Sequence, residues 1–195
     1  MSEIHNQDIA ELLGTLKVMP HALLQEYIAR RYNLTDNAAQ EIIYNACRPC
    51  RRRPVAYITK NGDVALGKDW EMNSKILQQC RAFRVCCEFL PAGREFTFSS
   101  VPPWILVFYE NGEIYYVCEF QRGTEYLQAE MIRTAGIPAE IQPQATRIGI
   151  LAPGANRNII HNCGIKYFCT VDDKFNLDVV ESVPDEEVWN GVPIV

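Results

Sequence analysis

The sequence predicts an α+β protein of two modules, a small helical module followed by a larger mixed α/β module. Apolar residues recur at helical spacing in three short segments between residues 8 and 48. The turn signals Asn61-Gly62 and Asn111-Gly112 each separate two strand-like runs, as in a hairpin. From residue 69 onwards helical and strand-like segments alternate, which indicates a sheet with helices against its faces.

Composition is that of an ordinary globular chain, but charge is unevenly distributed. The 195 residues are 48% hydrophobic and 22% charged. Residues 1–84 carry 12 Lys and Arg against 9 Asp and Glu, a net charge of +3, whereas residues 85–195 carry 7 against 15, a net charge of −8. We therefore expect two modules with different partners, of which the front one can approach a polyanion.

The distribution of apolar residues and cysteines disfavours several classes of protein. No apolar run approaches the ~20 residues that span a bilayer, and the amino terminus is too polar for a secretory signal. The eight cysteines are scattered, and they include the adjacent pair Cys86-Cys87, which favours reduced thiols over a disulfide framework. We expect a cytoplasmic protein that does not contact a membrane.

The first module, residues 1–67, is expected to hold three helices and a hairpin. Helices are predicted at residues 8–19, at residues 21–32 after Pro20, and up to residue 48 after a cap at Thr35 or Asp36. Two strand-like runs flank Asn61-Gly62 within residues 53–67. Three short helices followed by a hairpin are the element order of a winged helix-turn-helix domain.

In such a domain the third helix can enter the major groove of DNA, and the hairpin, or wing, can contact the backbone. The outward positions of the predicted third helix carry amides, which can pair with adenine edges, and Tyr and Arg, which can contact phosphate or guanine. A run of arginines follows the helix, and a lysine lies near the wing tip. The candidate DNA-binding residues are therefore Asn37, Gln40, Tyr44, Asn45, Arg48, Arg51, Arg52, Arg53 and Lys60.

Two features of this module leave alternatives open. Glu41 lies in the middle of the predicted DNA-reading face, where it would repel phosphate, so protein docking and a purely structural role remain alternatives. The spacing Cys47-x-x-Cys50 suggests a zinc or redox site, but a matching second pair of ligands is not present, and the motif closes a helix instead of opening one. We expect neither a metal nor a cofactor.

The second module, residues 68–195, is expected to begin with a joining helix at residues 68–90. Strands are predicted at residues 94–100, 103–110 and 112–121, then a helix at residues 125–135 capped by Thr124. A buried strand, a short helix and a closing hairpin follow at residues 146–153, 154–162 and 165–181. The order is α-β-β-β-α-β-α-β-β.

An α-β-β-β-α-β core is the skeleton of the PD-(D/E)xK nuclease superfamily. With a winged helix in front, the chain resembles the replication-relaxation proteins of bacterial plasmids and conjugative elements, over about 30 residues at motif level. Pro102-Pro103 takes the place of the PD pair that opens one strand, and Glu119-Phe120-Gln121 takes the place of the Glu-x-Asp that ends another. Arg122-Gly123-Thr124-Glu125 agrees with the remainder of the family pattern. The resemblance implies a restriction-endonuclease-like second domain.

Departures from this pattern point away from catalysis. Phosphodiester cleavage of this kind needs Mg²⁺ held by carboxylates from two strands, usually with a lysine beside the second. Pro103 occupies the position of the aspartate and Gln121 that of the lysine, which leaves Glu119 alone. No spacing brings another carboxylate to it, although candidates exist in Glu71, Glu88 and Glu113. We expect no catalytic residue, only the relic candidates Glu119 and Gln121, with Glu119 paired to Arg122 or another cation.

The sequence thus predicts a non-enzymatic, DNA-binding regulatory protein of a bacterial mobile element, an accessory to transfer or replication. Double-stranded DNA is the expected partner of the winged helix. A protein partner or a second copy of the chain is the expected partner of the acidic C-terminal domain. Two alternatives remain: a Mg²⁺-dependent nuclease with a rearranged active site, and a protein–protein adaptor that does not bind nucleic acid.

Overall fold

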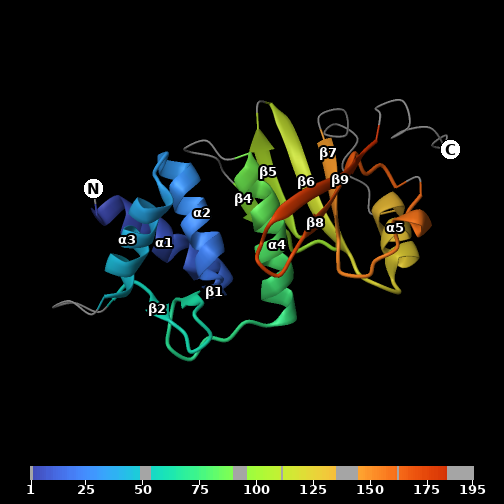
Figure 1. Ribbon diagram of the computed structural model, residues 1–195. Coiled ribbons are helices and arrows are strands. Elements are labelled where there is room, and N and C mark those ends of the chain that lie inside the picture. The colour runs from blue at the N-terminus through green and yellow to red at the C-terminus, as the bar shows by residue number, and fades with distance from the viewer. Residues whose placement is uncertain are drawn as a thin grey trace. The chain divides into compact units, whose positions relative to one another are not determined.

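The computed structural model describes residues 2–48, 54–89, 96–110, 112–134, 145–161 and 163–183. Within these residues the fold is mixed α+β, with five α-helices and a six-stranded mixed sheet, as the predicted fold class requires at this level (Figure 1). Contacts divide the chain into two compact units, unit 1 (Met1–Cys80 and Leu90–Gly93) and unit 2 (Arg81–Phe89 and Arg94–Val195). No helix in the described ranges is both long enough and apolar enough to cross a membrane.

Three helices lie wholly in unit 1. α1 (Ser2–Leu16) begins at Ser2 instead of residue 8 and buries the expected apolar residues, Ile9, Leu12, Leu13 and Leu16. α2 (His21–Tyr32) has the predicted bounds, and it ends where Asn33 adopts a left-handed φ of 51° and donates its N–H to carbonyls of the last turn. α3 (Asp36–Cys47) begins after Thr35, whose side chain accepts a hydrogen bond from the Ala38 N–H.

A three-stranded sheet in the order β1-β3-β2 completes unit 1. β2 (Tyr57–Ile58) and β3 (Val64–Ala65) form the predicted hairpin, in which Gly62 has a φ of 86°. The prediction of a helix up to residue 19 is wrong at its end. α1 stops at Leu16 because Lys17 adopts a φ of 70°, and the next two residues pair with β3 as β1 (Val18–Met19).

Unit 2 is built on a sheet whose six strands lie in sequence order, from β4 to β9. β6–β7 and β7–β8 are parallel pairs and the other pairs are antiparallel. The strands are β4 (Phe96–Phe98), β5 (Leu106–Glu110), β6 (Glu113–Phe120), β7 (Ala145–Leu151), β8 (Tyr167–Val171) and β9 (Leu177–Ser182).

The helices around this sheet are shorter than predicted. α4 (Ser74–Glu88) begins after Asn73, whose side chain accepts a hydrogen bond from the Ile76 N–H, so the joining helix does not start at residue 68. α5 (Glu125–Thr134) lies close to its predicted bounds. Of the helix expected at residues 154–162, the described part, residues 154–161, has only the 3₁₀ turn η2 (Arg157–Ile159) as helix.

Each face of the sheet carries a different helix, because successive residues of a strand point to opposite faces. On β6, Tyr115 stacks on Phe108 and contacts Phe89 just after α4, and Glu119 contacts α4 directly. The alternate residues Cys118 and Phe120 belong to an apolar cluster that includes residues of α5. Tyr115 and Tyr116 therefore lie on opposite faces of the sheet, and Tyr116 contacts Trp104 of the apolar cluster.

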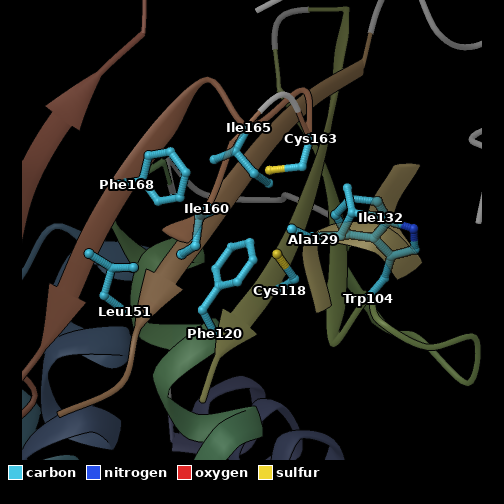
Figure 2. Close-up of a cluster of buried hydrophobic side chains, with 10 residues drawn as sticks. All are labelled: Trp104, Cys118, Phe120, Ala129, Ile132, Leu151, Ile160, Cys163, Ile165 and Phe168. Atoms are coloured by element: carbon cyan, nitrogen blue, oxygen red, sulfur yellow. The ribbon is translucent and has the colours of Figure 1, made fainter. Parts of the chain in front are cut away.

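Figure 2 shows the apolar cluster on the α5 side of the sheet. Within it the rings of Phe120 and Phe168 lie 5.9 Å apart between centroids. A Cβ atom on Gly149 of β7 would lie 2.8 Å from the Phe120 ring and 3.1 Å from the Phe168 ring. A glycine is needed at this position because the two rings fill the space of its side chain. The members of the cluster are Trp104, Cys118, Phe120, Ala129, Ile132, Leu151, Ile160, Cys163, Ile165 and Phe168.

Candidate functional site

The outward face of α3 carries the candidate DNA-reading residues. Ala39, Ile43 and Ala46 bury the opposite face of the helix in the core of unit 1. The side chains on the outward face are exposed, and that of Tyr44 is 60% exposed. The exposed residues are Asn37, Gln40, Glu41, Tyr44 and Asn45 on the helix, and Arg48 at its C-terminal cap. The structure thus brings six polar or aromatic groups together on one helical face.

Lys60, the candidate on the predicted wing, is exposed in the turn between β2 and β3. Thr59 holds this turn closed, since its N–H donates to the Asp63 carbonyl and its hydroxyl oxygen accepts from the Asp63 N–H. Lys68 lies nearby in the same unit, with its ammonium 5.8 Å from the centre of the Tyr57 ring. Arg51, Arg52 and Arg53 lie outside the described residues.

Cys47 ends α3, and it is half-buried. Burial raises the pKa of its thiol, so less of the reactive thiolate is present at neutral pH than in an exposed cysteine. This shift disfavours the redox interpretation of the Cys47-x-x-Cys50 spacing. Cys50 lies outside the described residues.

Glu119 is buried near the end of β6 and forms an ion pair with Arg81 of α4. Arg81 Nη1 donates to Glu119 Oε1 at 2.7 Å, and the side chains of Arg81 and Glu119 are 10% and 0% exposed. Burial raises the pKa of Glu119, while the charge and hydrogen bond of Arg81 oppose that rise. The cation beside Glu119 is therefore Arg81, not Arg122.

Gln121 follows β6 and is half-buried. Its N–H donates to Gln128 Oε1 at 2.7 Å, and Gln128 Nε2 in turn donates to the Glu119 carbonyl at 3.0 Å. A side chain of α5 thus satisfies backbone groups that the end of the strand would leave unpaired. Gln121 is therefore part of the junction between β6 and α5.

The Arg122-Gly123-Thr124-Glu125 motif also forms this junction. Gly123 has a φ of 83°, and the Thr124 carbonyl accepts the Gln128 N–H of the first turn of α5. Glu125 is buried and accepts the Asn156 N–H at 2.9 Å, a bond that lowers the pKa of its carboxyl. The motif therefore ties the loop after β6 to the loop after β7, and Arg122 is exposed at its edge.

The two candidate carboxylates of unit 2, Glu88 and Glu113, do not join Glu119. Glu113 opens β6 and lies about 20 Å from Glu119 along the strand, at roughly 3.3 Å per residue. Glu88 pairs with Arg84 at 2.6 Å, and Glu71 is exposed in unit 1. Among the described residues, no group of three or more His, Cys, Asp or Glu side chains could hold a metal ion.

Arg81 is the residue at this position that sequence reasoning missed. It lies four residues after Leu77 and four before Val85, so it stands within an apolar stripe along α4. An arginine in an apolar stripe signals a buried cation that needs a carboxylate partner. The signal does not say which carboxylate, because Glu119 lies 38 residues away in the chain.

No protein-family model, curated protein or solved structure matches the chain. Its function must therefore be inferred from its own residues and their geometry.

Proposed function

We propose that the protein is a non-enzymatic, DNA-binding regulator of a bacterial mobile element, an accessory to transfer or replication. In this proposal unit 1 is a winged helix-turn-helix that binds double-stranded DNA, and unit 2 is a PD-(D/E)xK-like domain without its metal site. The single observation that carries the DNA-binding part is the exposed outward face of α3. The link to replication-relaxation proteins rests on the motif between Val101 and Glu125.

The architecture of unit 1 supports the winged-helix part. Three helices precede the β2–β3 hairpin of a small antiparallel sheet, and α3 follows α2 after a short turn at Asn33–Thr35. The apolar side of α3 packs in the core of unit 1, and its outward side chains are exposed to solvent. A helix held in this way can lie in the major groove with its amides towards base edges, while Lys60 of the wing contacts phosphate.

The Arg81–Glu119 pair supports the loss of metal chemistry in unit 2. A carboxylate that holds Mg²⁺ for hydrolysis must be open to the ion and to its water ligands. The Glu119 side chain has no exposed surface, and the guanidinium of Arg81 already compensates its charge. In this proposal Arg81 supplies the positive charge that a metal ion supplies in an active nuclease, which argues against the rearranged-nuclease alternative.

The edge strand β9 supports a protein partner for the acidic half of the chain. It is the last strand of the sheet, and its Val179 and Val180 are 67% and 53% exposed. An edge strand with exposed apolar side chains can add a strand of another chain. Light scattering after size-exclusion chromatography tests whether that chain is a second copy. If it is a second copy, the wild type should be a dimer and the Val180→Lys variant a monomer. A monomeric wild type would show that the partner is not a second copy.

The test is a fluorescence titration of a labelled DNA duplex at salt concentrations of about 50 mM and 200 mM. Wild-type affinity should fall steeply as salt rises, because each neutralised phosphate releases counterions. Arg48→Ala and Lys60→Ala should each reduce the slope of log K against log salt by about 0.9, and joint replacement of Arg51, Arg52 and Arg53 by alanine should flatten it further. Tyr44→Ala should weaken binding while leaving stability within about 0.5 kcal/mol.

Lys174→Ala is the matched control, because Lys174 is an exposed lysine in a turn of unit 2. This substitution should leave the slope unchanged. Equal slopes in wild type and in all variants would contradict DNA binding by the outward face of α3.

A parallel incubation of the protein and DNA with Mg²⁺ or Mn²⁺ tests the nuclease alternative. DNA cleavage by wild type that is absent in Glu119→Gln would support that alternative.

A further inference from the structure

Glu41 occupies the middle of the outward face of α3, where its role must differ from that of its neighbours. Asn37, Glu41, Tyr44 and Arg48 follow one another at spacings of four, three and four residues, so they lie along one line of the helix. Glu41 is exposed near the centre of that line. A side chain near the centre of the face that a helix turns towards the major groove can reach base edges.

A carboxylate in that position discriminates strongly between bases. It can accept a hydrogen bond from the N4 amino group of cytosine, but guanine presents the two acceptors N7 and O6, which repel it. We propose that Glu41 is a specificity residue that selects cytosine and rejects guanine at one position of the DNA site. This inference rests on the DNA-binding function proposed for unit 1 and adds a base preference to it.

Neighbouring amides extend the expected site. Gln40 lies beside Glu41 on the helix, and Asn37 and Asn45 lie one turn before and after it. Asn and Gln side chains form bidentate pairs with adenine N6 and N7. The selected cytosine should therefore be flanked by adenines on the strand that α3 faces. The carboxylate of Glu41 weakens binding to DNA of any sequence, but it also makes binding to sites without the cytosine still weaker.

Selection of binding sequences from a pool of random duplexes tests this inference on the full chain. Wild-type protein should enrich sites with cytosine at one position. Glu41→Gln should change that position towards adenine, because glutamine is both donor and acceptor. Titrations with two duplexes that differ only in a C·G or G·C pair there should show roughly 5- to 100-fold discrimination by wild type, lost in Glu41→Gln.

Glu71→Gln is the control, since it removes the same charge from an exposed position of unit 1 outside α3. It should leave the selected sequence unchanged. If wild type and Glu41→Gln enrich the same sites, the specificity role of Glu41 is wrong while DNA binding stands. If wild type enriches no site and shows no salt-dependent binding, the proposed function itself fails, and the inference fails with it.

Discussion

The outward face of α3 and the end of β6 use polar side chains in opposite ways. On α3, six polar or aromatic side chains are exposed, and the fold is held by the apolar residues on the other side of the helix. At the end of β6, Glu119 is buried against Arg81, and Gln121 is joined to α5 through Gln128. Side chains left exposed in this way are available to a ligand, whereas those at the end of β6 are used by the fold itself.

This contrast predicts where substitutions affect stability and where they affect binding. Removing a buried charge partner leaves the other charge without compensation, which costs much more than removing an exposed group. Unit 2 should therefore lose stability on substitution near Glu119, and unit 1 should tolerate changes on α3. Four substitutions, in order of decreasing effect, sharpen the comparison.

The largest effect is expected for Arg81→Ala. The substitution leaves the Glu119 carboxylate buried without its cation, and breaking a buried pair in this way costs about 3–5 kcal/mol. Hydrogen exchange measured by mass spectrometry should show faster exchange in peptides of β6, with little change in peptides of α1. The double variant Arg81→Met, Glu119→Leu should recover most of the loss, because an apolar pair leaves no charge uncompensated. Unchanged exchange in β6 would contradict a structural role for the pair.

A second loss of stability is expected for Gly149→Ala. The added methyl group would lie within 3.1 Å of two aromatic rings in the core of unit 2, and overpacking of this kind costs about 1–3 kcal/mol. Urea denaturation can be monitored by hydrogen exchange in peptides of β7. The urea concentration at its midpoint should be lower than in wild type. Partial recovery in the double variant Gly149→Ala, Phe168→Leu would assign the loss to contact with the rings. A midpoint equal to that of wild type would show that the core relaxes around the methyl group.

The third prediction concerns pH. Because burial raises the pKa of Glu119 above its ordinary value of 4.5, the folded protein binds more protons than the unfolded chain between that value and the raised pKa. The contribution of this carboxyl to stability is thus fully present below pH 4.5 and is lost as pH rises through the raised pKa. The free energy of unfolding of wild type minus that of Glu119→Gln should fall with rising pH across this window and then level off. A difference that increases with pH would contradict the raised pKa.

The smallest effect, and one of opposite sign, is expected for Gly14→Ala in unit 1. A Cβ atom on Gly14 meets no atom within 4 Å, and the residue lies inside α1 with no positive φ. Alanine should stabilise the helix by about 0.5–1 kcal/mol, because it loses less backbone entropy on folding. Slower exchange in peptides of α1 would support this, and faster exchange would contradict it. The same Gly→Ala change is thus predicted to stabilise unit 1 and destabilise unit 2.

Local patterns predicted much of the fold. The apolar stripe of residues 21–32 predicted α2 with its observed bounds, and Asn61-Gly62 predicted the turn between β2 and β3. The order of helices and strands after residue 69 also matches the observed order, except that a 3₁₀ turn stands where the short helix at 154–162 was predicted. These successes share a cause, because helical periodicity and turn chemistry are properties of residues that lie close together in the chain.

Features that depend on distant residues could not be predicted in the same way. Val18 and Met19 continue the apolar pattern of α1, and only their pairing with β3 makes them a strand. Arg81 is one of two arginines in α4, and only the fold shows that its partner is Glu119. Gly149 looks like any glycine in an apolar strand until two phenylalanines from neighbouring strands close over it.

The amino-acid sequence by itself determined the mixed α+β class, most helices and turns, and the polar side of α3, because each of these follows from the spacing of residues along a few turns of chain. Only the tertiary structure decided which charged groups are exposed and which are compensated inside the protein. Burial and charge pairing depend on what packs against a residue, and that neighbour can come from any part of the chain.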